Sequence, residues 1–576
     1  MKNNYHVYRT MTSFTWDMEI KLTAARIPIG TEKIVFGHTF NKTIDEGGLP
    51  ESLRYIKFGW AFNQLIGKNV LPNSLKSIKF GHSFNQPICE NVLPESLESI
   101  KFGKMFDQPL YPNVLPKSLK FIDLNSFYQE LCPNVLPNSL ESIILGRRTG
   151  HTLLPNVLPA SLKSIEFCNF YHTLELGVLP GSVESLYLGY GFNYQLLPNV
   201  LPNSLKFINL GYSYNSVIDE NVLPNSLEQI EFGYTFDQLI GENVLPNSLI
   251  SIKFGCKYNQ PLRPNVLPNS LKSIFFYNYN HPIHPNVLPD SLESLNLGYE
   301  FNQELRPNVL PNSLKIIDLG NGFNLPIGEN VLPNSLESIE FGYRFNQQIV
   351  ENTLPNSPKH MRFGWKFNQP LLPNTLPTSL TSIGFFIFNQ PLQPNVLPES
   401  LESINFGSEF NQVLSPGDLP KSLKSIRFSD KFNQQICQGV LPDSLKYVYF
   451  GNNFNQPITS MFIPDGVEEI VLGSNFKEKI DVGYLPANLK YLRVANENTL
   501  DVLNTAAHDL YFFVVFTGYM RMNYFPKYQI LSFTNSGRNR EGIRKIGTEM
   551  IDGKKYNILI HTKSYEPKIR AKSAMK

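Results

Sequence analysis

The chain has 576 residues with a formal net charge of +2; 42% of the residues are hydrophobic and 17% are charged. This composition excludes intrinsic disorder, because enough apolar side chains are present to form a continuous core. The small net charge hides one basic region. Residues 535–576 hold 11 Lys and Arg against 4 Asp and Glu, so the rest of the chain is net acidic.

Nothing in the sequence indicates secretion or a membrane anchor. The five cysteines are odd in number and lie at non-equivalent positions, so they form neither a disulfide framework nor a CxxC metal pair. The N-terminus lacks the apolar run of a signal peptide, and the longest apolar run, Leu510–Phe516, is too short for a membrane-spanning helix. We expect a soluble cytoplasmic protein, with the nucleus as the alternative location and with no membrane partner.

Residues 1–26 precede the first repeat and are predicted to form an N-terminal cap. Their segment SFTWDMEIKL has the composition of a β-strand. Repeat arrays need such a cap because the terminal coil would otherwise leave its apolar side in water.

From Ile27 onward a Leu-Pro or Ile-Pro pair recurs every 21 or 22 residues, as far as Leu485. A fixed period of this length indicates a repeat array. In Ser74–Phe80 the last residues alternate between apolar and polar, which is typical of a half-buried strand. We therefore predict a mainly β, right-handed parallel β-solenoid of about 22 coils over residues 27–497. Its inward residues in one coil are Leu71, Leu75, Ile78, Phe80, Phe84 and Ile88.

Three polar positions of the repeat also allow predictions. Asn or Gly stands two residues before Leu-Pro, as at Asn69 and Gly47, and these residues favour a left-handed backbone. The Asn that follows Phe, as at Asn85, is expected to be a buried amide that hydrogen-bonds the turns of two coils. Lys and Glu alternate after the strand Leu, as at Lys76 and Glu98, which predicts cross-strand ion pairs and disfavours a nucleic-acid groove.

Residues 498–576 form the third predicted region, a small C-terminal capping segment. The run LYFFVVF at Leu510–Phe516 is expected to be a buried strand that covers the last coil. The segments IGTEMI and KKYNILIH flank Asp552-Gly553, a two-residue turn signal for a β-hairpin. The final residues form a basic tail, which could bind nucleic acid only weakly.

The repeat resembles a known family. FNQPI at Phe84–Ile88 and at Phe454–Ile458, together with FNQPL at Phe367–Leu371, is closely similar to the FNIP repeat. With the intervening LPxSLxSIxFG, the resemblance covers Ile27 to Val494. It implies a leucine-rich-repeat-like fold and a source among amoebae or the giant viruses that infect them, hence the host cytoplasm for a viral protein. FNIP repeats often follow an F-box, which implies substrate selection for a ubiquitin ligase, but residues 1–26 contain no recognisable F-box.

No enzyme motif is recognisable: P-loop, GxGxxG before a helix, HExxH and GxSxG are all missing from the sequence. His281 and His284 are the closest approach to a metal motif, and their spacing alone is a weak signal without further ligands nearby. We therefore expect a protein that is not an enzyme and that holds no cofactor and no metal.

The pattern breaks in several neighbouring coils, where Arg, His and aromatic residues replace the repeat consensus. These residue types are enriched in binding hot spots, so the break defines a candidate interaction patch, with slightly degenerate coils as the alternative interpretation. The patch comprises Tyr128, Arg147, Arg148, His151, Phe170, Tyr171 and His172. The leading hypothesis is a non-catalytic scaffold for unidentified protein partners. The alternative is the substrate-recognition subunit of a ubiquitin ligase, with ligase components as partners.

Overall fold

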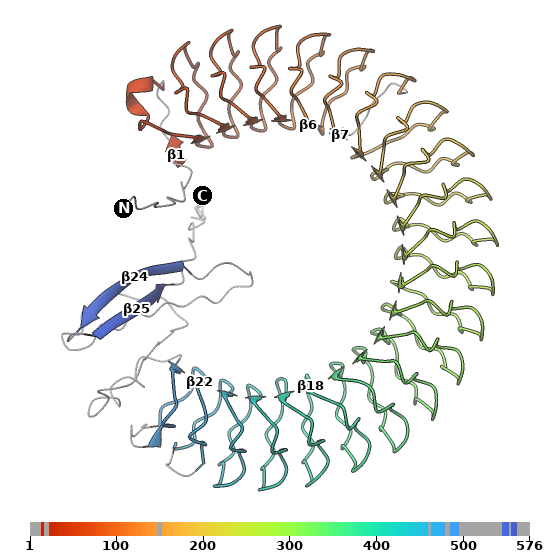
Figure 1. The fold of residues 1–576 in the computed structure, drawn as a ribbon, viewed down its shortest axis with the longest axis vertical. Helices are drawn as coiled ribbons and strands as arrows, with labels where there is room; N and C mark the ends of the chain where they lie inside the picture. The colour runs from red at the N-terminus through yellow and green to blue at the C-terminus, as the bar shows by residue number, and fades with distance from the viewer. Residues whose placement is uncertain are drawn as a thin grey trace, which may run out of the picture. The chain divides into compact units, whose positions relative to one another are not determined.

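The computed structural model describes residues 13–16, 22–146, 153–458, 462–478, 484–494, 544–551 and 554–560. The chain divides into two compact units, Met1–Gln303 (unit 1) and Glu304–Lys576 (unit 2). Both units repeat one coil, a short strand followed by turns that return the chain to the next strand. Within each unit the strands lie side by side on the concave side and the turns lie outside (Figure 1). The predicted parallel β-solenoid is confirmed.

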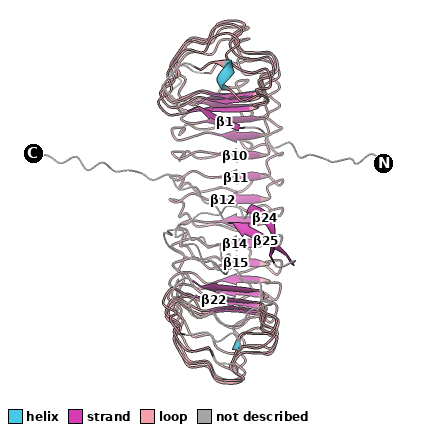
Figure 2. Cartoon of the chain, turned by 90° about the vertical axis from the view of Figure 1, so that its left-hand side faces the viewer, coloured by secondary structure: helices cyan, strands magenta, loops and turns pink. Residues whose placement is uncertain are grey.

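The strands of unit 1 pair in parallel and in chain order, and Figure 2 shows β10, β11 and β12 stacked in this way. They are β1 (Ser13–Trp16), β2 (Lys33–Phe36), β3 (Tyr55–Lys57), β4 (Ser77–Lys79), β5 (Ser99–Lys101), β6 (Phe121–Leu124), β7 (Ser142–Leu145), β8 (Ser164–Phe167), β9 (Ser185–Tyr187), β10 (Phe207–Asn209), β11 (Gln229–Glu231), β12 (Ser251–Lys253), β13 (Ser273–Phe275) and β14 (Ser294–Asn296). A 3-10 turn, η1 (Ala24–Arg26), lies between β1 and β2.

Unit 2 has the same type of coil, again with parallel neighbours in chain order. Its solenoid strands are β15 (Ile316–Asp318), β16 (Ser338–Glu340), β17 (His360–Arg362), β18 (Ser382–Gly384), β19 (Ser403–Asn405), β20 (Ser425–Arg427), β21 (Tyr447–Tyr449), β22 (Glu469–Leu472) and β23 (Tyr491–Val494). Two further strands, β24 (Arg544–Ile551) and β25 (Lys554–Ile560), pair with each other in antiparallel fashion.

The core consists of stacked Leu, Ile and Phe side chains. Leu75 and Ile78 are fully buried, and every other inward residue predicted for their coil is buried as well. The ring of Phe80 stacks on Phe58 of the preceding coil, with centroids 5.5 Å apart, and on Phe84 of its own coil at 4.0 Å. Burial of these side chains is the main stabilising contribution to the fold. It requires stacked neighbours, because one coil alone cannot remove its apolar side chains from water.

The left-handed turn residues are confirmed. Asn69 has φ 58° and Asn91 has φ 60°, while Gly47 has φ 70° at the equivalent position. Asn and Gly tolerate this conformation better than other residues, which explains why this position holds Asn in most coils and Gly in the others.

The asparagine ladder, formed by the Asn or Asp that follows the second Phe or Tyr of most coils, is also present. The side-chain Oδ1 of Asn63 accepts the backbone N–H of Asn85 at 2.9 Å and the Nε2 amide of Gln86 at 3.1 Å. These two bonds explain why Gln follows Asn in so many copies. The prediction of a buried amide is wrong in one respect. Asn85 is only half-buried, because the ladder runs along the surface of the turns.

A second ladder was not predicted, and it accounts for the Ser of the Leu-Pro-x-Ser motif. Ser74 Oγ donates a hydrogen bond of 2.7 Å to the backbone carbonyl oxygen of Leu53 in the preceding coil. This bond satisfies the backbone carbonyl of the Leu that lies two residues before the strand. The same bond is made by Ser96, Ser118, Ser204, Ser226, Ser422 and Ser444.

The two ends agree with the sequence where they are described. Strand β1 forms within SFTWDMEIKL and pairs with β2, and Trp16 is buried there. Strands β24 and β25 form on either side of the turn signal at residues 552–553, as expected for the hairpin. The turn itself, the run at residues 510–516 and the end of the basic tail lie outside the described residues.

Candidate interaction surface

The outward face of the strands is the surface that the repeat leaves available for other functions. In β4 the side chain of Ile78 is buried, while Ser77 and Lys79 on either side of it point outward and are partly exposed. Strand alternation repeats this arrangement in each coil. The core therefore constrains the middle residue of each strand and leaves the flanking residues free to vary.

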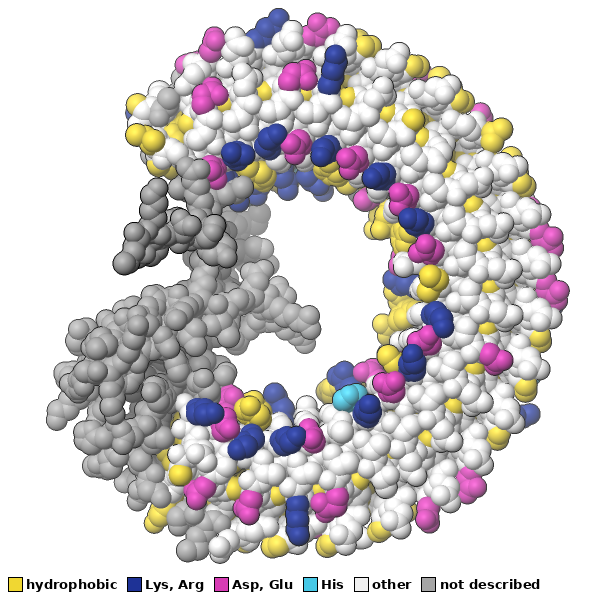
Figure 3. All heavy atoms as spheres, viewed as in Figure 1, with side chains coloured by type: hydrophobic (Ala, Val, Ile, Leu, Met, Phe, Trp, Pro, Cys, Tyr) yellow, Lys and Arg dark blue, Asp and Glu magenta, His cyan; other side chains and the backbone are white. Residues whose placement is uncertain are grey.

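Charges of both signs lie along this face, as the alternating dark blue and magenta side chains on the concave edge show (Figure 3). Lys76 Nζ lies 2.8 Å from Glu98 Oε1, and Lys206 Nζ lies 3.1 Å from Glu184 Oε2. The bond from Lys76 also lowers the pKa of Glu98. The predicted cross-strand ion pairs are thus confirmed, although such exposed pairs contribute little stability.

An aromatic row borders this face in unit 1, on the turns that directly follow three strands. The tyrosine row consists of Tyr190, Tyr212 and Tyr234, which follow the strand in three consecutive coils and are 65%, 45% and 39% exposed. Ring centroids are 5.7 Å apart for Tyr190 and Tyr212, and 4.7 Å apart for Tyr212 and Tyr234. Tyrosines that stand in solvent this way offer apolar area and a hydroxyl to a partner.

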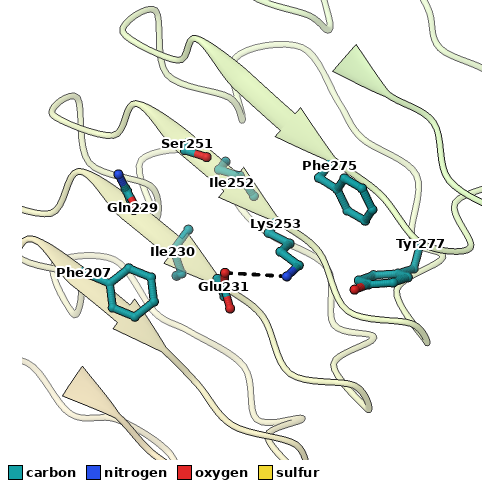
Figure 4. Close-up of a pocket in the computed structure, with 9 residues that line it drawn as sticks. All are labelled: Phe207, Gln229, Ile230, Glu231, Ser251, Ile252, Lys253, Phe275 and Tyr277. Atoms are coloured by element: carbon teal, nitrogen blue, oxygen red, sulfur yellow. Dashed lines mark ion pairs between the residues drawn. The ribbon is translucent and has the colours of Figure 1, made fainter. Parts of the chain in front are cut away.

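A shallow hollow of about 270 Å³ lies beside this row (Figure 4). Figure 4 shows Phe207 on one side and Phe275 with Tyr277 on the other. Between them Lys253 Nζ lies 3.6 Å from Glu231 Oε1. The hollow thus combines aromatic walls with an ion pair.

Unit 2 has a larger open hollow on its own strands, of about 610 Å³. This unit 2 hollow lies over Gly384, with Arg362 and Phe386 on one side and Arg427 on the other. The guanidinium carbon of Arg362 lies 5.0 Å from the centroid of the Phe386 ring.

The described residues of the patch predicted from the repeat breaks lie outside the strands, in the segments that return the chain to the next strand. Tyr128 is 39% exposed and its backbone N–H donates to Asp107 Oδ1 at 2.8 Å, in the position of an asparagine-ladder residue. Tyr171 is 47% exposed. Its ring covers Gly191, where any side chain would collide with it.

Phe170 corrects one part of the patch prediction. It is buried, its ring stacking on Phe192 at 5.9 Å, so it belongs to the core and not to a binding surface. The neighbouring His172 is partly exposed. Arg147, Arg148 and His151 lie outside the described residues, so the patch as a whole stays a prediction.

The histidine pair singled out in the sequence takes part in the turns. A ring nitrogen of His281, Nε2, lies 2.7 Å from the carbonyl oxygen of Asn259 in the preceding coil. Within the described ranges, no three His, Cys, Asp or Glu side chains are grouped as metal ligands would be. Nor is any helix in those ranges long and apolar enough to cross a membrane.

The tyrosine row and the two hollows were missed by the sequence analysis. A signal for the row exists, because Tyr or Trp follows the strand Gly in several copies, as at Tyr212, Tyr234 and Trp365. The predicted patch rests on breaks in the consensus, whereas these residues occupy a regular position of the coil.

Parallel strands, a stacked Leu and Phe core and polar ladders between coils define the class of protein, a leucine-rich-repeat-like β-solenoid. The FNIP Repeat family model matches fifteen overlapping or adjoining stretches that together span residues 21–494. The chain belongs to the FNIP-repeat family.

A solved structure of substantial sequence identity agrees with this assignment. The crystal structure of CroV588, a novel circular LRR protein, is 41% identical, with a TM-score of 0.74 over 84% of this chain and 79% of that chain. The mouse RP105/MD-1 complex matches at 12% identity and a TM-score of 0.49, over 88% of this chain and 86% of that one. No curated protein sequence matches the chain significantly.

Proposed function

We propose that the chain is a non-catalytic scaffold that binds a protein partner through the outward face of its strands. The observation that carries this proposal is the tyrosine row, Tyr190, Tyr212 and Tyr234, three neighbouring rings that remain partly exposed to solvent. The core does not require them, since the buried residues of each coil are supplied by other positions. Aromatic residues held in this way are the usual centre of a protein interface.

The surroundings of the row fit an interface better than an active site. The aromatic hollow beside it is shallow, and its only charged groups, Glu231 and Lys253, already pair with each other. The Nζ atom of Lys257 lies 6.0 Å from the centroid of the Tyr234 ring, so a charged group stands beside the row, as at the polar rim of an interface. A stable interface needs about 1,000 Å² or more of buried surface, which a row of adjoining coils can supply.

Affinity capture with the full-length chain tests the proposal. The wild type and a variant with Tyr190→Ser, Tyr212→Ser and Tyr234→Ser are used as bait in an extract of the cells that make the protein. We expect the variant to lose partners that the wild type retains. The matched control carries Tyr128→Ser and Tyr171→Ser, two exposed tyrosines on the turns.

The outcome also separates the two surfaces. If the strand-face variant retains every partner, the proposal is overturned. If the turn variant alone loses partners, the patch predicted from the repeat breaks is the binding surface. Co-purification of a Skp1-like adaptor would support the ubiquitin-ligase alternative, which rests on the family resemblance alone.

A further inference from the structure

Gly384 interrupts the row of side chains at the third strand position of unit 2. In register it lies between Arg362 of β17 and Asn405 of β19, and the next residue in the row is Arg427 of β20. A residue without a side chain at this point opens the row. The unit 2 hollow lies over the opening, with Ser382 and Ser403 also lining it.

The backbone does not require glycine at this position. The φ angle of Gly384 lies outside the left-handed region, and an added Cβ would meet only Arg362 Cγ, at the ordinary contact distance of 3.9 Å. Gly364 is the opposite case, because a Cβ there would collide with the carbonyl oxygen of Gly342. Glycine weakens a strand, and where folding does not demand it, it often marks the close approach of another chain.

The charged groups around the opening favour an anion. Arg362 lies over the Phe386 ring and its Nη1 is 3.8 Å from Glu340 Oε1, while its side chain remains 59% exposed. Among the residues that the structure describes, none forms an ion pair with Arg427. His360 lines the same hollow. The two arginines stand three strand spacings apart, or about 14 Å at the backbone, so their side chains border the hollow from opposite sides.

We propose that the unit 2 hollow binds an Asp or Glu side chain on an extended segment of a protein partner, an inference that rests on the proposed scaffold function. The partner carboxylate lies between Arg362 and Arg427, since guanidinium groups bind carboxylates with paired hydrogen bonds. The partner backbone passes over Gly384, and an apolar neighbour of the acidic residue packs on Phe386.

Fluorescence polarisation with the full chain tests this proposal. The probe is a labelled dodecapeptide of four Glu-Ser-Leu repeats, and the control peptide has Gln in place of Glu. We expect the Glu peptide to bind at least tenfold more tightly than the Gln peptide. Arg427→Gln and Gly384→Val should each weaken its binding at least fivefold. Glu340→Gln should strengthen it, because a competing carboxylate is removed from Arg362.

Stability measurements show whether a weaker complex reflects the site itself. Gly384→Val should melt at or above the wild-type temperature, because a β-branched residue replaces a strand glycine. If Gly384→Val does not fold, the binding of the Glu peptide to Arg427→Gln tests the proposal, because Arg427 faces solvent and its replacement should not affect folding. The proposal is overturned if the Glu and Gln peptides bind equally, or if the folded variants bind like the wild type. Binding only when phosphoserine replaces Glu would overturn the carboxylate assignment.

Failure here is distinguishable from failure of the scaffold function. The tyrosine-row variant should bind the Glu peptide like the wild type, because its changes lie in unit 1. A different result is that replacement of the tyrosine row abolishes partner capture while replacement of Gly384 leaves peptide binding unchanged. That combination would overturn the inference about the unit 2 hollow and would still support the scaffold function.

Discussion

The carboxylate oxygen Oδ1 of Asp237 accepts the backbone N–H of Asn259, one coil further along the chain, at 2.9 Å. The same oxygen accepts Nε2 of Gln260 at 3.1 Å. Asn63 makes the same two bonds to its own successor coil. The asparagine ladder therefore needs an acceptor oxygen at this position, and Asp supplies it as well as Asn does.

Replacement of Asn63 by Ala should lower the stability of the array, because the backbone N–H of Asn85 and the amide of Gln86 both lose their acceptor. We expect a loss of about 1–2 kcal/mol, measured by thermal denaturation followed by circular dichroism. Asn63→Asp is the matched control and should stay close to the wild type. Equal losses in both variants would contradict the acceptor role.

Replacement of Thr353 by Val should stabilise unit 2. Thr353 is buried at the position where most coils have Val, and its hydroxyl has no hydrogen-bond partner among the described residues. Burying an unpaired hydroxyl costs about 1–3 kcal/mol, so the melting temperature should rise. Thr375 is the control, because it is equally buried but donates to the carbonyl oxygen of Leu372 at 2.7 Å. Thr375→Val should not stabilise, and a rise as large as that of Thr353→Val would refute the explanation.

Replacement of Pro358 by Leu should also stabilise unit 2. Other coils have Leu here, and the N–H of Leu380, for example, donates to the carbonyl oxygen of Pro377 at 3.1 Å. Pro358 cannot make this bond, and the neighbouring Ser357 hydroxyl is buried without a partner among the described residues. We expect a gain of about 1 kcal/mol in chemical denaturation. The reverse change, Leu380→Pro, should destabilise; a neutral result for both would contradict this account.

Three buried tyrosines should make the array sensitive to alkali. Burial raises the pKa of Tyr214 and Tyr258 above 10.0, and that of Tyr279 to about 12. Above pH 10 an unfolded chain releases these protons while the folded chain keeps them, so stability falls as the pH rises from about 10 towards 12. Each tyrosine contributes a slope of up to about 1.4 kcal/mol per pH unit.

A triple Tyr→Phe variant at these positions tests the effect, since Phe occupies them in most coils. Its melting temperature between pH 8 and 11.5 should fall less steeply than that of the wild type. The control replaces the exposed Tyr190, Tyr212 and Tyr234 by Phe. If the control changes the slope as much as the core variant, burial is not the cause.

The fold was largely predictable because each coil has the same arrangement of a short strand, buried apolar side chains and polar turns. A fixed period brings equivalent residues into register, so Phe58 stacks on Phe80 without any information from distant segments. The left-handed turn at Asn69 was predictable for the same reason, since its conformation depends on local sterics.

The binding surface was much less predictable. Phe170 looked like a candidate surface residue in the sequence, yet its ring is buried against Phe192. The sequence does not distinguish Gly364 from Gly384. In the structure, an added Cβ would collide with the backbone at Gly364 and would fit without a clash at Gly384. Distinguishing them requires the distance to the preceding coil, which one coil of sequence does not contain.

The coil, its core positions and its polar turns follow from the amino-acid sequence, because they depend on short-range sterics and on a strict period. The positions of the other side chains depend on how the coils stack in three dimensions. Stacking places residues 22 positions apart beside each other, as with Tyr212 and Tyr234. It thereby creates the tyrosine row and the unit 2 hollow. Those surfaces belong to several coils at once, and for that reason no single repeat reveals them.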